Sequence, residues 1–479
     1  MAQRISIPPL ADNNLVRNNC FGQLLSFFRY KGNGSAEVMM GPPNFCRVTD
    51  GTLYHAFDID NQEHADPDSV FALHGKFIFR FRARGTGKIR GGVRWRLSYF
   101  RGDMDTVEKS TPEYELTSEF QEYKLEGTVE DIHACVNDRL YWEVTGGYAD
   151  ITGIGLNYPE PAREVSFNVP HIVAQPGEEF SFKCEGAKEL LCCYGHCENG
   201  LPPELLENKE QVQMTLRAFG GEGMRFVGIG ESENSRRSLF VSSAPPRLVN
   251  RMRKCTFDKA PRHLLFFGDS LTAYDAGRNY TDIAGAFLPD SWSYMNAGIG
   301  GDDLPRLAKR LQGKPRTYRL EHFDHIWDRT PDEIFLFYGA NDSKAPWRYD
   351  YKVPTTSLED EKILLEEIWQ VFQEKAPDAR VTIIASAPGY HLYQQERNGR
   401  LRVQQIQNSC FGIPEHVKNF NRTAKEFAEK KKWNYLDFHR ICMAHGDLRS
   451  LFIPDDGVHM TLSGHQVLAA ALLEYLQKK

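Results

Sequence analysis

The alternation of apolar and polar residues in the first third of the chain predicts β-strands. In "KFIFRFRAR", Phe77, Phe79 and Phe81 fall on one face of an extended segment and arginines fall on the other. A period of two is typical of an antiparallel strand with one buried face. The glycine-rich stretch "GTGKIRGG" that follows is predicted to be a hairpin turn, with "VRWRLSYF" as the partner strand. Further alternating segments at similar spacing predict a β-sandwich over residues 1–160.

Short strand patterns continue after a proline-rich boundary, "NYPEPAREV", and predict a second, smaller, immunoglobulin-like β-sandwich over residues 161–250. Within it, "LCCYGHC" offers Cys192, Cys193, His196 and Cys197 as possible zinc ligands. A structural zinc site usually draws its two ligand pairs from separated segments. The alternative, which the single short run favours, is a set of buried free thiols in a strand and turn.

The pattern changes after "SAPPRLVN", where short apolar segments begin to alternate with long amphipathic ones. The strand candidates include "HLLFFG" and "EIFLFYG", and the last helix candidate, "SGHQVLAAALLEYLQKK", places Ser463 as its N-cap. Alternating strands and helices predict a doubly wound α/β domain with a parallel sheet over residues 251–479. Ligands bind outside the carboxyl ends of the strands of such sheets, so the chemistry is expected at that edge.

Composition and charge exclude some classes of function. A chain of 479 residues is long enough for two or three domains, and its formal charge of -6 gives no basic field that would attract nucleic acid. No apolar run is long enough to span a bilayer. The start, "MAQRISIPPLADNN", lacks the apolar core of a secretory signal. We therefore expect either a cytoplasmic protein or one whose leader is missing from this sequence; the oligomeric state is left open.

The candidate chemistry lies at the predicted strand ends. "GDSLT" provides Ser270, whose hydroxyl becomes a nucleophile only if a base accepts its proton. His459 in "DDGVH" is the natural base, because the ordinary pKa of histidine lies near neutral pH, and Asp456 can orient its ring. The alternative for Ser270 is an ordinary helix cap, and for His459 an ordinary surface histidine.

An acyl-transfer enzyme also needs hydrogen-bond donors for the oxyanion of its tetrahedral intermediate. The Ser270 N–H, the Gly301 N–H in "NAGIGGDD" and the Asn341 side chain in "YGAND" fit that need. Two alternatives to these donor roles stay open: a turn of the backbone that requires Gly301, and an Asx turn formed by Asn341. Asp302 is expected to help fix the oxyanion loop and is also a candidate substrate contact. Asp342 is expected to be structural, and His465 in the last helix is expected to be either a packing residue or a solvent-facing one.

Along the chain these four blocks follow one another as "GDSLT", "NAGIGGD", "GAND" and "DDGVH". In this order and approximate spacing they resemble the signature blocks of the SGNH hydrolases, also called GDSL esterases and lipases. The resemblance covers about residues 260–479. It implies a flavodoxin-like three-layer α/β/α fold, Ser270, Asp456 and His459 as a catalytic triad, and Ser270, Gly301 and Asn341 as the oxyanion hole. It implies no metal or organic cofactor.

The long segment after "VTIIASAP" is expected to shape the substrate pocket. Tyr390, His391 and Tyr393 could stack on or hydrogen-bond to a sugar; an ordinary surface insertion is the alternative. The N-terminal sandwich loosely resembles jelly-roll modules of carbohydrate acetyl esterases. Its arginine row could bind an acidic glycan, but cross-strand charge pairing is the commoner explanation.

The predicted function is that of a serine esterase which removes acetyl or other small acyl groups from an acylated carbohydrate. Two rival classes stay open. One is a different acyl hydrolase, such as a lipase, thioesterase or arylesterase. The other is a glycan-binding protein that uses the α/β domain as a scaffold.

Overall fold

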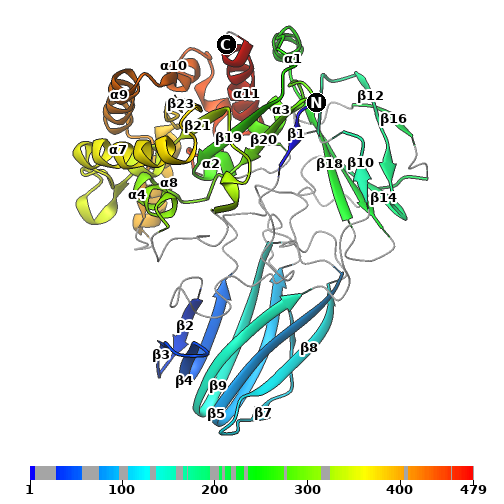
Figure 1. Ribbon diagram of the computed structural model, residues 1–479, viewed down its shortest axis with the longest axis vertical. Coiled ribbons are helices and arrows are strands. Elements are labelled where there is room, and N and C mark those ends of the chain that lie inside the picture. Colours follow the sequence, from blue (N-terminus) through cyan, green and yellow to red (C-terminus); the bar gives the residue numbers. More distant parts are fainter. Residues whose placement is uncertain are drawn as a thin grey trace.

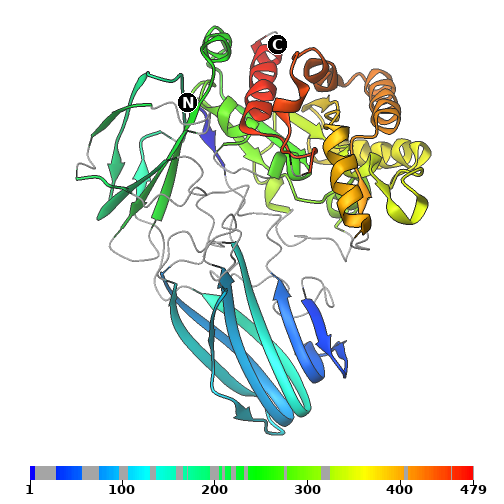
Figure 2. The same ribbon diagram turned by 180° about the vertical axis from the view of Figure 1, so that it is seen from behind.

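The computed structural model places two β-rich units and one α/β unit along the chain (Figure 1). In Figures 1 and 2, which view it from opposite sides, the N-terminal β-sheet lies below, and the smaller β-unit lies beside the α/β unit above. None of the helices in the described residues is long and apolar enough to cross a membrane. The structure describes residues 1–5, 28–56, 75–96, 106–129, 136–157, 165–169, 171–194, 204–207, 211–216, 223–230, 236–273, 278–313, 324–403, 408–454 and 456–477.

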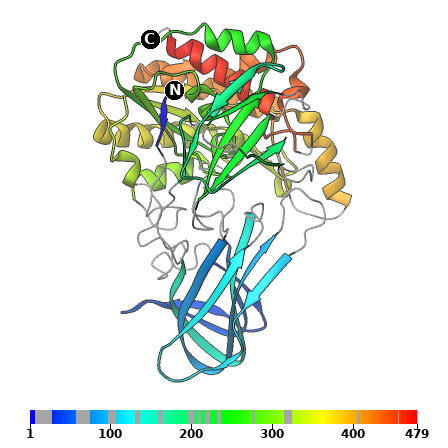
Figure 3. The same ribbon diagram turned by 90° about the vertical axis from the view of Figure 1, so that its right-hand side faces the viewer.

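The N-terminal unit is an eight-stranded antiparallel sheet built around two strands of 22 residues each (Figure 3). Its main path runs β2-β4-β9-β5-β6; β3 pairs with β4, and β7 and β8 pair with β5. The alternating phenylalanines Phe77, Phe79 and Phe81 are buried and pack with Trp142, as the period of two predicts. The strands are β2 (Phe28–Gly32), β3 (Ala36–Met39), β4 (Phe45–Ala56), β5 (Gly75–Arg96), β6 (Thr106–Ser110), β7 (Tyr114–Glu115), β8 (Gln121–Val129) and β9 (Val136–Asn157).

The hairpin turn predicted at "GTGKIRGG" is wrong, because β5 runs straight through it. The pairing of β5 with β9 shifts register between Thr86 and Lys88, at Gly87, whose φ is +81°. A Cβ on Gly87 would also meet the backbone of Thr145 and Gly146. Glycine permits a bulge inside a strand as readily as a turn between strands, so the composition alone could not separate the two.

Two arginines of the row on this sheet, Arg84 and Arg94, form ion pairs within the sheet. Arg84 and Arg47 both contact the buried Asp150, at 3.1 and 2.7 Å, and Arg94 contacts Glu108 at 2.6 Å. The Arg82 guanidinium lies 5.5 Å from the centre of the Phe120 ring. Cross-strand charge pairing, the explanation favoured by the sequence, therefore accounts for Arg84 and Arg94 of the row.

The second β-unit is a small sandwich. The rings of Phe182 and Phe226, which come from different sheets, lie 4.6 Å apart in its core. Cys192 is buried in the same core, as expected of a structural thiol, while His196 and Cys197 lie outside the described residues. The described residues contain no cluster that could hold a metal ion. The strands are β10 (Ser166–Phe167), β11 (His171–Ala174), β12 (Glu179–Phe182), β13 (Cys184–Glu185), β14 (Glu189–Tyr194), β15 (Glu204–Leu205), β16 (Val212–Thr215), β17 (Met224–Ile229) and β18 (Arg236–Ser243).

The α/β unit contains a six-stranded parallel sheet in the order β1-β20-β19-β21-β23-β25. Its edge strand β1 is Gln3–Arg4, so the first residues of the chain belong here and not to the N-terminal β-unit to which the pattern assigned residues 1–160. A two-residue strand carries too little periodicity to be recognised. The other strands are β19 (Arg262–Gly268), β20 (Trp292–Asn296), β21 (Glu333–Phe337), β23 (Arg380–Ile384) and β25 (Asn434–Leu436).

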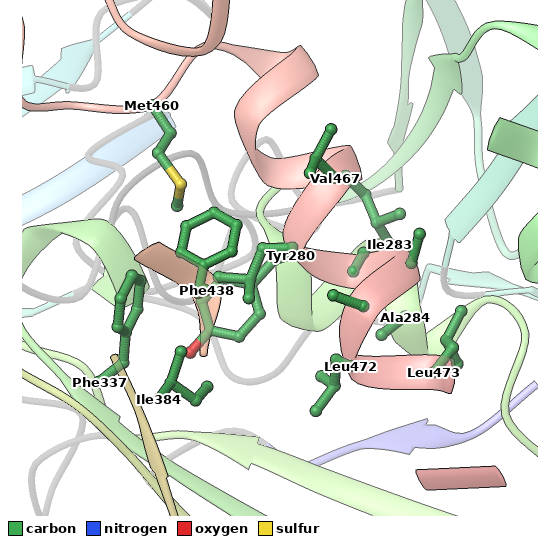
Figure 4. Close-up of a cluster of buried hydrophobic side chains, with 14 of the residues drawn as sticks. Tyr280, Ile283, Ala284, Phe337, Ile384, Phe438, Met460, Val467, Leu472 and Leu473 are labelled. Atoms are coloured by element: carbon green, nitrogen blue, oxygen red, sulfur yellow. The ribbon is translucent and has the colours of Figure 1, made fainter. Parts of the chain in front are cut away.

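Consecutive residues of β19 point to opposite faces of the sheet and enter two separate cores. Leu264 and Phe266 pack under α3 and α11, and Leu265 and Phe267 pack under α4, α7 and α9. This makes the three layers that the strand and helix pattern predicts, and Figure 4 shows part of the first core. The helices are α1 (Pro246–Arg253), α2 (Ser270–Ala273), α3 (Tyr280–Gly285), α4 (Leu304–Leu311), α6 (Ala340–Ser343), α7 (Leu358–Lys375), α8 (His391–Val403), α9 (Pro414–Lys431), α10 (Phe438–Met443) and α11 (Leu462–Gln477); a short ribbon pairs β22 (Ala345–Pro346) with β24 (Ser409–Cys410).

Helix α11 begins one residue earlier than the predicted cap. Ser463 lies inside the helix, and the Thr461 hydroxyl accepts the Gly464 N–H instead. Threonine can cap a helix as serine does, so the local pattern allowed either start. His465 is buried and stacks on Tyr280, a packing role that agrees with its predicted one.

Helix α7 carries a buried carboxylic acid, Glu361, which predicts a pH-dependent stability. Both of its oxygens are buried without a hydrogen-bond partner in the described residues, in a cavity of about 10 Å³ whose lining is mostly aliphatic and aromatic and includes Tyr338 and Asn421. Burial, reinforced by Asp342, raises the pKa of Glu361 to about 10. The native state therefore keeps a proton that the unfolded chain loses above about pH 4.5, so stability falls as the pH rises from there toward 10.

We expect Glu361→Gln to remove this loss, because the amide does not titrate. The free energy of unfolding of Glu361→Gln, relative to that of the wild type, should be nearly unchanged at pH 4.5. The difference should then grow in favour of the variant by up to about 1.4 kcal/mol per pH unit up to pH 8. Urea unfolding at pH 5 and pH 8 measures it, and Glu359→Gln, on the exposed side of the same helix, is the control. Equal stability differences at the two pH values would contradict the assignment.

Candidate active site

Ser270 stands directly after strand β19, at the first residue of the short helix α2. Gly268 makes this turn possible, because a Cβ there would collide with the Thr272 side chain. The carboxylate of Asp269 accepts the Leu271 N–H at 2.9 Å and fixes the turn from inside. Ser270 follows the carboxyl end of β19 and is 9% exposed, so it lies at that edge of the sheet and is largely covered.

The structure brings Ser270 and His459 together although 189 positions separate them. His459 Nε2 lies 2.9 Å from Ser270 Oγ, and His459 Nδ1 lies 2.5 Å from Asp456 Oδ2. The other oxygen of Asp456 accepts the N–H groups of Val458 and His459, at 2.8 and 3.0 Å. The loop therefore holds the carboxylate and the imidazole in one line that ends at the serine hydroxyl.

This environment keeps Asp456 ionised. Burial acts to raise its pKa, but the hydrogen bond and charge of His459, together with the two backbone N–H donors, outweigh burial and lower the pKa below its ordinary value. An ionised Asp456 accepts the Nδ1 proton of His459, which leaves Nε2 free to take the proton of Ser270.

Gly301 and Asn341, the predicted oxyanion donors, stand at the ends of the two strands that flank β19. Gly301 has a φ of +68°, and its carbonyl accepts Arg306 Nη1 at 2.7 Å. Among the described residues, no acceptor bonds the backbone N–H of Gly301 or of Ser270. Asn341 is 4% exposed and donates from Nδ2 to Asp269 Oδ2 at 3.3 Å. One further proton of that amide and two backbone N–H groups are therefore available for an oxyanion.

Gly339 explains how Asn341 reaches this position. Its φ is +119°, and a Cβ on it would lie 2.7 Å from the Ser386 Cβ. Only glycine fits such a tight exit from strand β21 into α6. An Asx turn would require the Asn341 side chain to bond the backbone nearby. Its hydrogen bonds are instead to the side chains of Asp269 and Lys344.

The structure places Asp302 in the core, a position that does not favour its predicted contact with a substrate. Its carboxylate is fully buried, forms an ion pair with the equally buried Arg310, and accepts the Tyr338 hydroxyl at 2.9 Å. The reason is its place in the loop: Gly301 faces the site, and the next side chain turns into the core. Its position agrees with the other expected role, which is to fix the oxyanion loop from behind.

The three predicted sugar contacts, at the start of helix α8 and just before it, form two separate groups. Tyr390 and Tyr393 pack together with ring centres 4.7 Å apart, and Arg449 donates to the Tyr393 hydroxyl at 2.5 Å. His391 instead lines a cleft of about 400 Å³. The Tyr390 N–H also donates to the Gly457 carbonyl at 2.6 Å, so α8 is tied to the loop that carries His459.

Three polar residues of the site were missed by the sequence analysis: Arg306, Lys344 and Gln394. Arg306 binds the Gly301 carbonyl, Lys344 binds the Asn341 side chain, and Gln394 donates to the Asp456 carbonyl. Lys344 lies three residues after Asn341, a helical spacing that could have indicated contact. Arg306 lies five residues after Gly301, which is not such a spacing. Gln394 offered no local signal, because its partner is 62 positions away.

Comparison with known proteins agrees with this architecture. Residues 266–467 match the family described as GDSL-like lipase/acylhydrolase. The C-terminal α/β unit therefore contains a GDSL-like lipase/acylhydrolase domain over these residues. No curated protein sequence matches the chain significantly.

Solved structures similar to the chain cover a little under half of it. A lipase/acylhydrolase from Enterococcus faecalis has 19% identity and a TM-score of 0.33, covering 45% of this chain and 96% of its own. An acetylxylan esterase from Geobacillus stearothermophilus has 18% identity and a TM-score of 0.33, covering 46% of this chain and 96% of its own. A GDSL-like lipase from Parabacteroides merdae, itself described as putative, has 19% identity and a TM-score of 0.32, covering 47% of this chain and all of its own.

Proposed function

We propose that the protein is a serine esterase that removes acetyl or other small acyl groups from a carbohydrate. The observation that carries the proposal is the continuous contact from Asp456 through His459 to Ser270, with distances of 2.5 and 2.9 Å. A serine hydroxyl held against an oriented imidazole is the arrangement that activates a nucleophile.

The reaction follows from these contacts. His459 Nε2 takes the Ser270 proton as Oγ attacks the ester carbonyl, and the oxyanion is bound by the N–H groups of Ser270 and Gly301 and by Asn341 Nδ2. His459 then gives the proton to the leaving hydroxyl of the sugar, which departs and leaves an acyl group on Ser270. Water, deprotonated by His459, attacks the acyl-enzyme, and collapse releases the carboxylic acid and restores the serine.

The cleft beside helix α8 supports a carbohydrate as the alcohol part of the substrate. It is lined by His391, Gln395, Asn398 and Gly399 from α8 and by Tyr351, Cys410 and Ile413 from other segments. Amides and a phenol can hydrogen-bond to sugar hydroxyls, and rings can stack on the apolar face of a sugar. A volume of about 400 Å³ lies within the range of small-molecule sites.

The cleft is fixed relative to the catalytic loop by a polar network. Gln394, the neighbour of Gln395, donates to the Asp456 carbonyl and accepts the Phe411 N–H at 3.3 Å. Asn408 joins Tyr351 and Asn398 across the cleft wall, each at 2.6 Å. A sugar bound there would therefore be held at a set distance from His459.

The experiment is an acetate-release screen on acetylated oligosaccharides, beside long-chain esters, acyl-CoA and p-nitrophenyl acetate. We expect release from an acetylated glycan. Gln395→Ala and His391→Ala should each raise KM for that glycan about tenfold, as expected for one lost hydrogen bond, and leave p-nitrophenyl acetate hydrolysis unchanged. Glu396→Ala, an exposed neighbour on α8, is the control.

Three outcomes would separate the rival classes. Cleavage of long-chain esters or acyl-CoA without release from any glycan would replace the substrate class with a lipase or thioesterase. Glycan binding without hydrolysis of any ester would favour a binding protein. Equal losses on glycan and p-nitrophenyl acetate in the cleft variants would contradict a role for the cleft in binding the sugar.

A further inference from the structure

The side chain of Asn341 is held at both ends by charged groups. Its Oδ1 accepts from Lys344 Nζ at 2.9 Å, and its Nδ2 donates to Asp269 Oδ2 at 3.3 Å. The amide itself is buried, at 4% exposure, whereas Lys344 is half-buried beside the Phe411 ring, 5.4 Å from its centre. These three residues come from the end of β19, from α6 and from the residue after α6, and they meet beside the nucleophile.

An amide has nearly the same shape in its two flipped orientations, so its neighbours decide which end faces the substrate. An ammonium group can only donate, and an ionised carboxylate can only accept. With Lys344 on one end and Asp269 on the other, a single orientation satisfies both partners. In that orientation Nδ2 faces Asp269, the residue before Ser270, and within the part of the chain that the structure describes its second proton has no acceptor.

We propose that Lys344 is a positioning residue for the oxyanion hole, whose charge fixes the Asn341 amide with its N–H toward the nucleophile and strengthens that N–H as a donor. The proposal rests on the proposed function, because it assumes that Asn341 binds the oxyanion. Without the ammonium group only the weaker 3.3 Å bond to Asp269 orients the amide, so its N–H is held less firmly toward the charge that develops in the transition state. The ammonium also polarises the amide bond, and a polarised donor binds an oxyanion more strongly.

The charges around Lys344 make this role dependent on pH. Burial lowers the pKa of Lys344; Arg306 on α4 acts in the same direction, and Asp303, Asp342 and Asp269 oppose it. The ammonium therefore loses its proton at a lower pH than an exposed lysine does. Burial also raises the pKa of Asp269 to about 6, so both partners of the amide are charged at neutral pH.

Lys344→Met tests the proposal, because methionine has a similar length and no charge. We expect kcat for p-nitrophenyl acetate to fall by about 10- to 100-fold, which is at most the fall expected when one oxyanion donor is removed. KM should stay within about threefold of the wild-type value. Lys344→Arg keeps the charge and the donors and should retain activity within about tenfold. Its alkaline loss of kcat should move to higher pH than in the wild type, because the guanidinium does not titrate there. Lys352→Met, an exposed lysine nearby, is the control.

A double-mutant cycle with Asn341→Ala decides whether Lys344 acts through Asn341. If it does, Asn341→Ala/Lys344→Met is no slower than Asn341→Ala alone. Additive losses, or an unchanged kcat in Lys344→Met, would overturn the proposal. The same cycle with Lys344→Gln keeps the comparison valid if the methionine variant does not fold. Ser270→Ala is measured alongside: an active Ser270→Ala would overturn both proposals, whereas unaltered kcat in Lys344→Met beside an inactive Ser270→Ala would overturn this one alone.

Discussion

Replacement of Ser270 by alanine is expected to lower kcat by about 10⁴- to 10⁶-fold, the range found when a serine nucleophile is removed. The reason is geometric: the Ser270 hydroxyl is the group that His459 Nε2 contacts at 2.9 Å, and alanine leaves nothing for the imidazole to deprotonate. Folding should be unaffected, because the hydroxyl points to the site rather than into a core. Acetate release, or hydrolysis of p-nitrophenyl acetate, measures the loss.

Ser463→Ala is the matched control for this variant. Ser463 is exposed within helix α11, and Thr461 supplies the cap of that helix, so the change should leave both activity and melting temperature unaltered. A Ser270→Ala enzyme that keeps more than about a hundredth of the wild-type kcat would show that the nucleophile lies elsewhere.

Replacement of Asp456 by asparagine is expected to lower kcat by about 10⁴-fold at pH 7, the loss typical of an orienting aspartate in a triad. Asparagine preserves the shape, but its N–H₂ group can face Nδ1 and favour the imidazole tautomer that has its proton on Nε2. That tautomer cannot accept the Ser270 proton. Steady-state kinetics, with Asp378→Asn at an exposed site as the control, measures the effect.

A second carboxylate, that of Asp269, is a candidate to orient the His459 imidazole in place of Asp456. Asp269 is buried close enough to His459 for the two charges to interact. If Asp456→Asn kept kcat within about tenfold while Ser270→Ala was inactive, another carboxylate would orient the imidazole, and Asp269→Asn would be the next variant to measure.

The residues of the candidate site could be predicted because they occupy strand ends. Parallel strands bring their carboxyl ends to one edge, so residues distant in sequence, such as Ser270 and Asn341, meet without any special contact between their segments. The Asp456–His459 pair is local, three positions apart in one loop. Topology and short spacing together were enough for these residues.

What escaped prediction depends on side-chain direction and on pairing between distant segments. Asp302 and Gly301 are adjacent, yet Asp302 faces the core and Gly301 faces the site. The sequence "GGDD" does not indicate these directions. The tie between Gln394 and Asp456 joins two loops whose distance is set only by the folded chain. The pairing of Gln3–Arg4 with β20 likewise depends on where the chain start lies in space, which a two-residue pattern cannot encode.

The central claim, that Ser270 is an activated nucleophile, is tested most directly by covalent labelling. A fluorophosphonate ester reacts with a serine only where a base and an oxyanion site activate it. Peptide mass spectrometry of the labelled full chain should find one adduct, on Ser270, formed in proportion to the loss of esterase activity and absent from Ser270→Ala. Complete inhibition with the adduct on another residue, or full esterase activity with no adduct, would contradict the account.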